Sequence, residues 1–401
     1  MSTNEQPSVA ILGAGLMGTA IAATHLKAGM EVMLYDPFSR PLAEAPQRIA
    51  AELELQQTDV STLTNLKTTA NLADLARYDI LIETIPEKLR AKQKLYRSLV
   101  EVTQNHSPLL FTNTSTIAIA DLAVAAPCPE RFCGFHFFHP VRERSLVEII
   151  SSRETSPQTV QNAQLHAQLI AKQPITVGDG PGFLVNRLLN PYLNEALLML
   201  ESGTQLETIE RVATDFGMAM GPFRIMDEIG LDVTLHAGWV LHKAFPDRAM
   251  ASPLLMEMVR HEKLGRKTGC GFYCYDVSVS WQGTGTPNSV FLEKFLLPPS
   301  ECKAATEQEI IDRLFYGMLL EAGRCVDDGI ICSLETADLA VVHGLGFPSK
   351  YGGLTDWAKK IGIVALREKM FQLEKHYGLR FQAGNHFFQL LEDGPSAIIS
   401  P

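Results

Sequence analysis

Apolar and polar residues follow two different periods in the first part of the chain. Short apolar runs at 8–12, 79–85 and 107–115 are typical of buried strands, whereas amphipathic stretches between them, such as 87–102, are typical of helices. Strands that alternate with helices in this way indicate a parallel sheet covered by helices. The pattern therefore predicts an α/β domain over residues 1–180.

From Gly182 onward the apolar residues recur with the period of a helix, and strand-like runs nearly vanish. We expect a first helical domain at 181–298 and a second at 299–401. A stretch rich in Ser, Gly, Thr and Pro at 276–304 is typical of a linker. The expected fold class is α/β followed by all-α.

The two helical blocks resemble each other. VNRLLNPYLNEALLMLESG at 185–203 matches IDRLFYGMLLEAGRCVDDG at 311–329 at an offset of 126, and EIGL at 228–231 matches KIGI at 360–363. The first match pairs Arg187 with Arg313, Glu195 with Glu321 and Gly203 with Gly329. Such a pattern indicates an internal duplication, whose copies could pack around a pseudo-two-fold axis as two subunits do.

Charge and composition exclude several classes of partner. The 401 residues include 35 basic and 45 acidic side chains, and the net charge of −10 disfavours binding to nucleic acid or anionic lipid. No run of about 18 apolar residues suggests a membrane span, and the N-terminal residues lack the pattern of a secretory signal. We therefore expect a cytoplasmic protein that binds neither nucleic acid nor membrane.

The seven cysteines are scattered along the chain, which fits free thiols in a reducing compartment. Cys270 and Cys274 are the only close pair near glycine, and no second pair completes a zinc site. No metal site is expected.

The turn after the first predicted strand has the pattern of a dinucleotide site. Gly13, Gly15 and Gly18 spell G-x-G-x-x-G between a predicted strand and a predicted helix. These glycines would allow a tight turn, approach to a pyrophosphate and close packing of the helix on the strand. Leu16 and Met17 complete the turn, and we expect all five residues to line the cofactor.

An acid follows this turn at the expected distance. Asp36 ends the second predicted strand, 21 residues after Gly15, where a carboxylate can accept a hydrogen bond from a ribose 2′-hydroxyl. The same charge repels a 2′-phosphate, so NAD is favoured over NADP, although Arg40 weakens this preference. FAD-binding folds share the glycine pattern, but nothing else in the chain favours FAD.

Two histidines and an acid stand in an unusually apolar region. Predicted strands at 131–140 and 145–151 carry His136 and Glu148, and a hairpin would bring these two together. Histidine ordinarily titrates near neutral pH and can take the proton of an alcohol, while a carboxylate on the other ring nitrogen fixes the tautomer. The alternative is a core histidine with satisfied hydrogen bonds. His139 would point to the opposite face, so shared metal ligation with His136 is not expected.

HFFHP at 136–140 followed by LVEII at 146–150 resembles the signature of the L-3-hydroxyacyl-CoA dehydrogenases. Further segments resemble that family in the same order, namely NTSTIAI at 113–119, DGPGFLVNRLLNPYLNEAL at 179–197, GPFRIMDEIGLDV at 221–233 and KLGRKTGCGFYCYD at 263–276. The doubled helical region and HGLGFP at 343–348 resemble the dehydrogenase half of multifunctional fatty-acid oxidation enzymes. The hydratase half of those enzymes has no counterpart here.

The resemblance implies roles for individual residues. His136 would be the general base in oxidation and the acid in reduction, and Glu148 would orient it. Ser115 and Asn186 match positions that contact the reacting end of the substrate. The cofactor-side positions implied by the resemblance are Glu87, Lys92, Ser115, His139 and Lys267. Each also has a structural alternative, such as a helix cap for Ser115 or a solvated charge for the lysines.

Three departures from the family pattern bear on the substrate. His139 replaces the usual Asn or Ser on the nicotinamide side, and His343 replaces a frequent tyrosine near the acyl pocket. Family members also carry a long, lysine-rich arm that helps to hold the coenzyme A phosphates. Residues 39–71 are shorter and contain only three cations, Arg40, Arg48 and Lys67.

These observations leave three hypotheses. The first is NAD-dependent oxidation of an L-3-hydroxyacyl thioester, in the first place an acyl-CoA of fatty-acid β-oxidation, or the reverse reduction. The second is a biosynthetic dehydrogenase of a carrier-protein-bound or unusual hydroxyacid, which the lysine-poor arm favours. The third is an inactive NAD-binding scaffold. The chain could form a homodimer, or stay monomeric with the repeat replacing the partner subunit.

Overall fold

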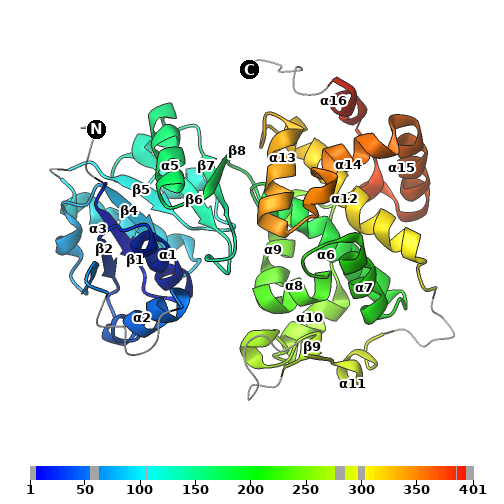
Figure 1. Cartoon of the computed structure of the whole chain (residues 1–401), viewed down its shortest axis with the longest axis horizontal. Coiled ribbons are helices and arrows are strands. Elements are labelled where there is room, and N and C mark those ends of the chain that lie inside the picture. The colour runs from blue at the N-terminus through cyan, green and yellow to red at the C-terminus, as the bar shows by residue number, and fades with distance from the viewer. Residues whose placement is uncertain are drawn as a thin grey trace. The chain divides into compact units, whose positions relative to one another are not determined.

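The structure is a computed structural model that describes residues 6–54, 63–104, 106–275, 285–296, 303–384 and 386–393. The chain forms two compact units, Met1–Phe183 and Leu184–Pro401, which we call unit 1 and unit 2. Figure 1 colours unit 1 from blue to green and unit 2 from green to red.

Unit 1 contains an eight-stranded sheet with the strand order β3-β2-β1-β4-β5-β6-β7-β8. Neighbouring strands are parallel except β6 and β7, which are antiparallel. The strands are β1 (Val9–Leu12), β2 (Val32–Tyr35), β3 (Leu66–Thr69), β4 (Ile80–Glu83), β5 (Leu109–Thr112), β6 (Phe132–Phe137), β7 (Leu146–Ser151) and β8 (Gln173–Gly178). The helices are α1 (Leu16–Lys27), α2 (Ser39–Glu52), η2 (Leu72–Leu75), α3 (Leu89–Val102), α4 (Ile119–Ala123), η3 (Pro129–Arg131) and α5 (Pro157–Leu169). The predicted α/β domain is confirmed as a Rossmann-like sheet with helices.

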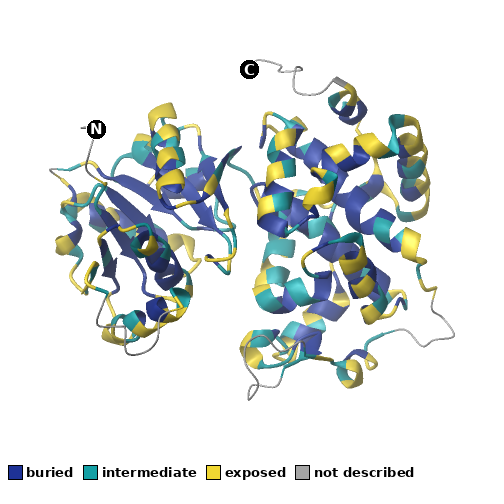
Figure 2. Cartoon of the chain, viewed as in Figure 1, coloured by how far each residue is buried: buried dark blue, intermediate teal, exposed yellow. Residues whose placement is uncertain are grey.

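Helices cover both faces of this sheet, whose strands are largely dark blue in Figure 2 because they are buried. One core joins α1, α2 and α5 to the strands and includes Phe135 and Phe137. On the other face, Tyr96 of α3 packs edge-on against Phe132 at 5.5 Å between ring centroids. Since side chains alternate along a strand, His136 points to the face opposite its two phenylalanine neighbours. The side chain of His136 in β6 therefore points away from the core formed with α1, α2 and α5.

The edge strand β3 was not predicted. Its sequence is LKTT, and all four residues are half-buried or exposed. An edge strand faces water on its outer side and pairs on one side only, so it needs no apolar run. The periodicity of residues 66–69 therefore carried no strand signal.

Unit 2 is helical, as the period of its apolar residues predicted. Its helices are α6 (Val185–Glu201), α7 (Leu206–Phe216), α8 (Pro222–Ile229), α9 (Leu231–Ala244), α10 (Pro253–Arg260), η4 (Arg266–Thr268), α11 (Ser289–Leu292), α12 (Glu307–Asp327), α13 (Leu334–Ala340), η6 (Val341–Leu345), η7 (Ser349–Tyr351), α14 (Leu354–Ile361), α15 (Ile363–Tyr377), η8 (Leu379–Phe381) and α16 (Phe387–Asp393). Within the described residues, no helix is both long and apolar enough to span a membrane.

The predicted linker at 276–304 is partly wrong. Residues 285–296 contain a short strand, β10 (Thr286–Pro287), which pairs antiparallel with β9 (Tyr273–Cys274), and the helix α11. The backbone of Asn288 also donates to the carbonyl of Phe272 at 2.9 Å. The polar composition suggested irregular structure, whereas pairing with β9 makes residues 286–287 a strand. Residues 276–284 and 297–302 of this stretch lie outside the described residues.

Helices α6 and α12 pack closely in unit 2. A Cβ atom added to Gly317 of α12 would lie 3.1 Å from Cβ of Pro191 in α6. Two buried ion pairs cross the interface: Arg187 Nη2 lies 2.6 Å from Glu321 Oε1, and Arg313 Nε lies 2.7 Å from Glu195 Oε2. These four side chains are all at most 6% exposed, so each charge needs its partner.

A pair of buried histidines joins α1 to α5 in unit 1. Nε2 of His25 lies 2.9 Å from Nε2 of His166, and Nδ1 of His25 lies 2.8 Å from the carbonyl oxygen of Ile21. Burial lowers the pKa of His25 to about 4, and burial together with His25 lowers the pKa of His166 well below its usual value. Both rings are thus neutral in the folded protein near pH 7.

We expect this pair to make the folded protein sensitive to acid. A histidine in the unfolded chain titrates near 6.5, so the unfolded state binds protons first and stability falls as the pH drops from about 6.5 to about 4. Complete loss of the His25 contribution amounts to about 3 kcal/mol. His166→Gln should reduce this slope in thermal melts recorded across that range. His376→Gln, at an exposed histidine of unit 2, should leave it unchanged. If the melting temperatures of the wild type and of His166→Gln fell equally with pH, the histidine pair would not be the source of the acid sensitivity.

Candidate functional site

The glycine turn between β1 and α1 has the shape that the sequence motif requires. Gly13 has φ +112°, and a Cβ atom there would lie 3.0 Å from the backbone oxygen of Thr84. A Cβ on Gly18 would lie 1.8 Å from the carbonyl oxygen of Gly13, so only glycine lets α1 pack this closely. A Cβ on Gly15 would meet nothing within 4 Å, which leaves open space beside the first turn of α1. This space suits a phosphate at a helix N-terminus.

Asp36 lies directly after β2 and connects to the same turn. Its Oδ2 accepts a hydrogen bond from the backbone of Ala14 at 2.9 Å, and its Oδ1 accepts from the backbone of Phe38 at 3.0 Å. Leu16 is 61% exposed and Met17 is half-buried at the start of α1. Asp36 therefore shapes the glycine turn, in addition to the ribose contact predicted for it.

A buried acid that the sequence analysis missed stands at the end of β4. Glu83 is fully buried and accepts hydrogen bonds from Lys92 Nζ at 2.7 Å, Tyr96 Oη at 2.6 Å and Thr112 Oγ1 at 2.8 Å. Lys92 is itself only 1% exposed, so its ammonium group faces this carboxylate and not open solvent. An acid inside the apolar run ILIE was the signal that could have identified Glu83.

Glu87 holds the turn that carries Ser115. Its Oε1 accepts from Thr114 Oγ1 at 2.6 Å and from the backbone of Ser115 at 2.8 Å and Thr116 at 2.9 Å. Burial alone would raise the pKa of Glu87, but the charge of Lys92 and these hydrogen bonds outweigh it and lower the pKa. Glu87 is thus an anion that fixes the loop after β5.

His136 and Glu148 face each other across the antiparallel strands β6 and β7. They are direct register partners, and His136 Nδ1 lies 2.7 Å from Glu148 Oε2. Glu148 is fully buried and His136 is 6% exposed. Because a carboxylate only accepts hydrogen bonds, Nδ1 carries the hydrogen and Nε2 keeps a lone pair. The ring is therefore prepared to accept a proton at Nε2.

Aromatic rings and an amide fix the position of His136. Its ring centroid lies 4.5 Å from that of Phe138 and 6.1 Å from that of Phe183, which has φ +49°. Asn113 Oδ1 accepts from the backbone of Phe137 at 2.8 Å and thereby ties the loop after β5 to β6. These three contacts were not predicted, because they join residues far apart in the sequence.

The remaining predicted site residues are divided between the units. Ser115 and His139 belong to unit 1, where Ser115 is half-buried and His139 is exposed before a cis peptide bond to Pro140. Asn186 and Lys267 belong to unit 2, where Asn186 is half-buried in the first turn of α6. The substrate and cofactor contacts predicted for these four residues stay predictions.

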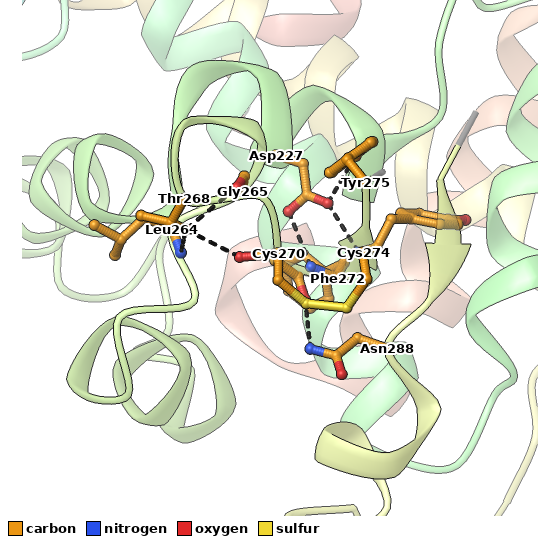
Figure 3. Close-up of a disulfide and its surroundings, with 11 residues drawn as sticks. Asp227, Leu264, Gly265, Thr268, Cys270, Phe272, Cys274, Tyr275 and Asn288 are labelled. Carbon is orange, nitrogen blue, oxygen red and sulfur yellow. Dashed lines mark hydrogen bonds between the residues drawn. A yellow bond between two sulfur atoms is a disulfide. The ribbon is translucent and has the colours of Figure 1, made fainter. Parts of the chain in front are cut away.

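The loop that carries Lys267 is well ordered by a buried acid (Figure 3). Asp227 accepts hydrogen bonds from the backbone of Phe272 and Tyr273 and from Tyr275 Oη, each at 2.9 Å. Burial raises the pKa of Asp227 to about 6. A Cβ on Gly271 would lie 1.9 Å from Asp227 Oδ1, so the close approach requires glycine. Lys267 itself pairs with Asp232.

The prediction of free thiols is wrong for Cys270 and Cys274, which form a disulfide in this loop (Figure 3). Cys270 and Cys274 pair as an antiparallel bridge across the turn at 271–273, and their Cα atoms lie 4.1 Å apart. This tight turn places the two thiols together, although the odd, scattered set of cysteines had favoured free thiols. Across the described ranges, no group of three or more metal-binding side chains occurs, and Cys302 lies outside them.

Comparison with known proteins finds one family for most of this architecture. Residues 8–180 match the model of the NAD binding domain of 3-hydroxyacyl-CoA dehydrogenase, and residues 182–275 match that of its C-terminal domain. The fatty acid oxidation complex subunit alpha of Acinetobacter baylyi is 34% identical over 382 residues, which is 92% of this chain and 53% of that protein. The chain thus spans about half the length of the curated relatives that it matches.

Two solved structures extend the comparison. The 3-hydroxybutyryl-CoA dehydrogenase of Escherichia coli K12 has a TM-score of 0.80 at 25% identity, with 96% of this chain and 98% of that chain covered. The (S)-3-hydroxybutyryl-CoA dehydrogenase of Ralstonia eutropha is 33% identical and has a TM-score of 0.62. The match covers 68% of this chain and 100% of that chain.

The open space at Gly15 gives a direct test of the cofactor turn. In Gly15→Ala the new Cβ has room and the backbone φ of −76° suits alanine, so the melting temperature should stay unchanged. The methyl group would occupy the space expected for the pyrophosphate and weaken NAD binding about ten-fold or more, about 1.4 kcal/mol. Calorimetric titration with NAD measures this. Gly29→Ala, outside the turn at φ +79°, is the control for a general glycine effect. Unchanged NAD affinity in Gly15→Ala would place the cofactor elsewhere.

Proposed function

Because the chain belongs to the 3-hydroxyacyl-CoA dehydrogenase family, we propose that it oxidises an L-3-hydroxyacyl thioester to the 3-ketoacyl thioester with NAD, or catalyses the reverse reduction. The observation that carries this proposal is the buried pair of His136 and Glu148, 2.7 Å apart, in the same sheet as the glycine turn. A histidine oriented by a carboxylate is the arrangement that proton removal from an alcohol requires.

The reaction needs one proton acceptor and one hydride acceptor. When bound, NAD supplies the hydride acceptor. Nε2 of His136 would take the proton of the 3-hydroxyl as the C–H bond at the same carbon breaks and the carbonyl forms. The resulting imidazolium would be stabilised by Glu148, whose carboxylate already bonds to Nδ1. In the reverse reduction His136 would return this proton to the alkoxide oxygen.

We assign the substrate and cofactor contacts by the family positions. Ser115 and Asn186 would contact the reacting end of the thioester, and Ser115 is held by the anion Glu87. Because Lys92 is buried against Glu83, we propose that it acts on the cofactor side through Glu87, 3.5 Å away. His139 and Lys267 would contact the cofactor directly.

We further propose that unit 2 consists of two copies of one helical module, with domain boundaries at 181–298 and 299–401. Three pairs of matching positions behave alike. The crossed ion pairs connect Arg187 to Glu321 and Arg313 to Glu195, the residues that the offset of 126 makes equivalent. Gly230 and Gly362, which precede α9 and α15, have φ of 99° and 88°.

A pair of helix-capping acids supports the same duplication. Glu210 Oε1 accepts from the backbone of Phe223 in α8 at 2.7 Å, and Asp338 Oδ1 accepts from the backbone of Thr355 in α14 at 2.9 Å. In both places the residue before the helix is a glycine into whose Cβ position the acid projects. Under this proposal the second copy would replace the partner subunit of a dimer. The cytoplasmic location and the oligomeric state stay predictions of the sequence.

A second candidate substrate class is favoured by the region after β2. All three cations between residues 39 and 71 are already paired with acids: Arg40 and Arg48 contact Glu44, and Lys67 contacts Glu31. These pairs are exposed, and the arm offers no surplus of positive charge for coenzyme A phosphates. A thioester on a carrier protein or on pantetheine would not need such charge.

The acid–base assignment predicts a selective loss of chemistry in His136→Gln. The kcat for NADH oxidation with acetoacetyl-CoA should fall by about 10²- to 10⁴-fold while NAD affinity stays unchanged. Glu148→Gln should also lower kcat, because the imidazolium loses its counter-charge. His106→Gln, at a 39%-exposed histidine of the same unit, should retain wild-type kcat. Folded, NAD-binding wild-type protein that turns over no short or long 3-ketoacyl thioester would favour the scaffold hypothesis instead.

The paired cations of the arm predict a weak preference for the nucleotide part of coenzyme A. An exposed ion pair is worth about 0–1 kcal/mol, so kcat/KM for acetoacetyl-CoA and for acetoacetyl-pantetheine should differ by less than about ten-fold. Steady-state assays with both thioesters at one ionic strength measure the ratio. An advantage of coenzyme A of a hundred-fold or more would eliminate the carrier-bound substrate.

A further inference from the structure

A charged cavity lies inside unit 2, and none of the site residues assigned above lines it. It is bordered by α6, the end of α9, α12 and η8. Its charged lining residues are Arg187, Glu195, Arg248, Glu321, Arg324 and Arg380. Pro191 and Gly317, where α6 and α12 approach most closely, also line it. These two residues are equivalent at the offset of 126, so the cavity lies where the two helical blocks meet.

The arginines of this region form two matching sets, and all of them except Arg313 line the cavity. In the first set, Arg187 and Arg248 both lie over the ring of Phe245, at 4.7 and 4.4 Å, and both contact Glu321. In the second set, Arg313 and Arg380 both lie over the ring of Tyr377, at 4.4 and 5.5 Å, and both contact Glu195. Phe245 and Tyr377, like Arg248 and Arg380, are equivalent at the offset of 132 that relates 228 to 360.

Each set contains two guanidinium groups for one carboxylate. The residues that break the symmetry do not correct this excess, because Arg324 brings one positive charge and Asp328, bonded to Arg187 and Arg248, brings one negative charge. Among the described residues, the ion-paired groups of this cluster therefore carry two surplus positive charges, and the acid Glu309 lies beside the second set, bonded to Tyr377. Burial, followed by the like charges of Arg248 and Arg187, lowers the pKa of Arg324 although Glu321 opposes the shift.

The hydrogen bonds of the cluster are also incomplete. Arg187 is 1% exposed; its Nε and Nη2 donate to Glu321 and Asp328, whereas its Nη1 has no hydrogen-bond partner among the described residues. A buried guanidinium nitrogen without an acceptor destabilises the fold, and so does an uncompensated buried charge. An acceptor that carries negative charge would satisfy both requirements at once.

We propose that this cavity binds a small oxyanion of the phosphate type, held by the guanidinium groups of both helical blocks. Guanidinium groups present paired N–H donors that match the oxygens of such an anion. The binding site is distinct from the acid–base pair of unit 1 and from the cofactor turn. It lies beside the first turns of α6, the helix that begins with Val185 and Asn186.

Inorganic phosphate is the probe for this site. In the full chain, saturated with NAD to cover the glycine turn, phosphate should raise the melting temperature in a saturable way and give a calorimetric Kd. Potassium chloride at the same ionic strength should not. Arg248→Gln removes one charge at a side chain that is 27% exposed, and it should weaken phosphate binding at least ten-fold. Arg380→Gln removes the equivalent charge of the second set and should have the same effect.

Arg211→Gln is the matched control, because Arg211 lies in α7 of the same unit, is 51% exposed and does not line the cavity. Its phosphate affinity should equal that of the wild type. Equal stabilisation by chloride would show general screening and overturn the proposal. Phosphate binding that survives both Arg248→Gln and Arg380→Gln in folded variants would also overturn it, since the anion would then bind elsewhere. Neither result depends on turnover, so the dehydrogenase proposal is tested separately.

Discussion

The carboxylate of Glu83 is the interaction on which the candidate site depends. It is fully buried at the end of β4, and the cost of its burial is offset by hydrogen bonds from Lys92, Tyr96 and Thr112 and from the backbone of Ile85. The side-chain donors come from α3 and β5, so one anion aligns two strands and a helix at the carboxyl edge of the sheet. Lys92, once fixed, stands near Glu87, and Glu87 holds the backbone of Ser115. The position of Ser115, a proposed substrate contact, thus depends on the buried carboxylate of Glu83, to which it is linked through Lys92 and Glu87.

The reversal of direction between β6 and β7 complements this arrangement. In a fully parallel sheet, residues twelve apart could not be direct neighbours without a crossover connection. The antiparallel pair makes His136 and Glu148 register partners, and alternation along both strands turns them away from the α1–α2–α5 core. Phe138 and Phe183 then enclose the ring. The acid–base pair is therefore a product of local topology, and the rest of the sheet supplies the rigid support.

Local signals in the sequence were enough for part of this structure. The glycine turn, Asp36, and the meeting of His136 with Glu148 each depend on residues close in sequence or on one hairpin. Spacing could therefore place these residues, but only the family resemblance favoured an acid–base pair over a core histidine. The strand β3, with the sequence LKTT, was not predicted because an edge strand needs no apolar pattern. Glu83 was not identified because its donors lie on separate elements, and the Cys270–Cys274 disulfide was not predicted because its thiols meet through the tight turn at 271–273. The linker prediction failed for a similar reason, since β10 gains its order from β9, a contact that composition does not reveal.

The packing of α6 on α12 has a consequence for how the protein behaves at low concentration. The crossed ion pairs of Arg187 with Glu321 and Arg313 with Glu195 join two helices of one polypeptide, so dilution cannot separate them as it separates two subunits. A covalently joined pair is also free to become unequal. Under the proposed duplication, the arginine at position 324 would correspond to the leucine at position 198. Two identical subunits could not hold such a difference, because every substitution would appear in both of them.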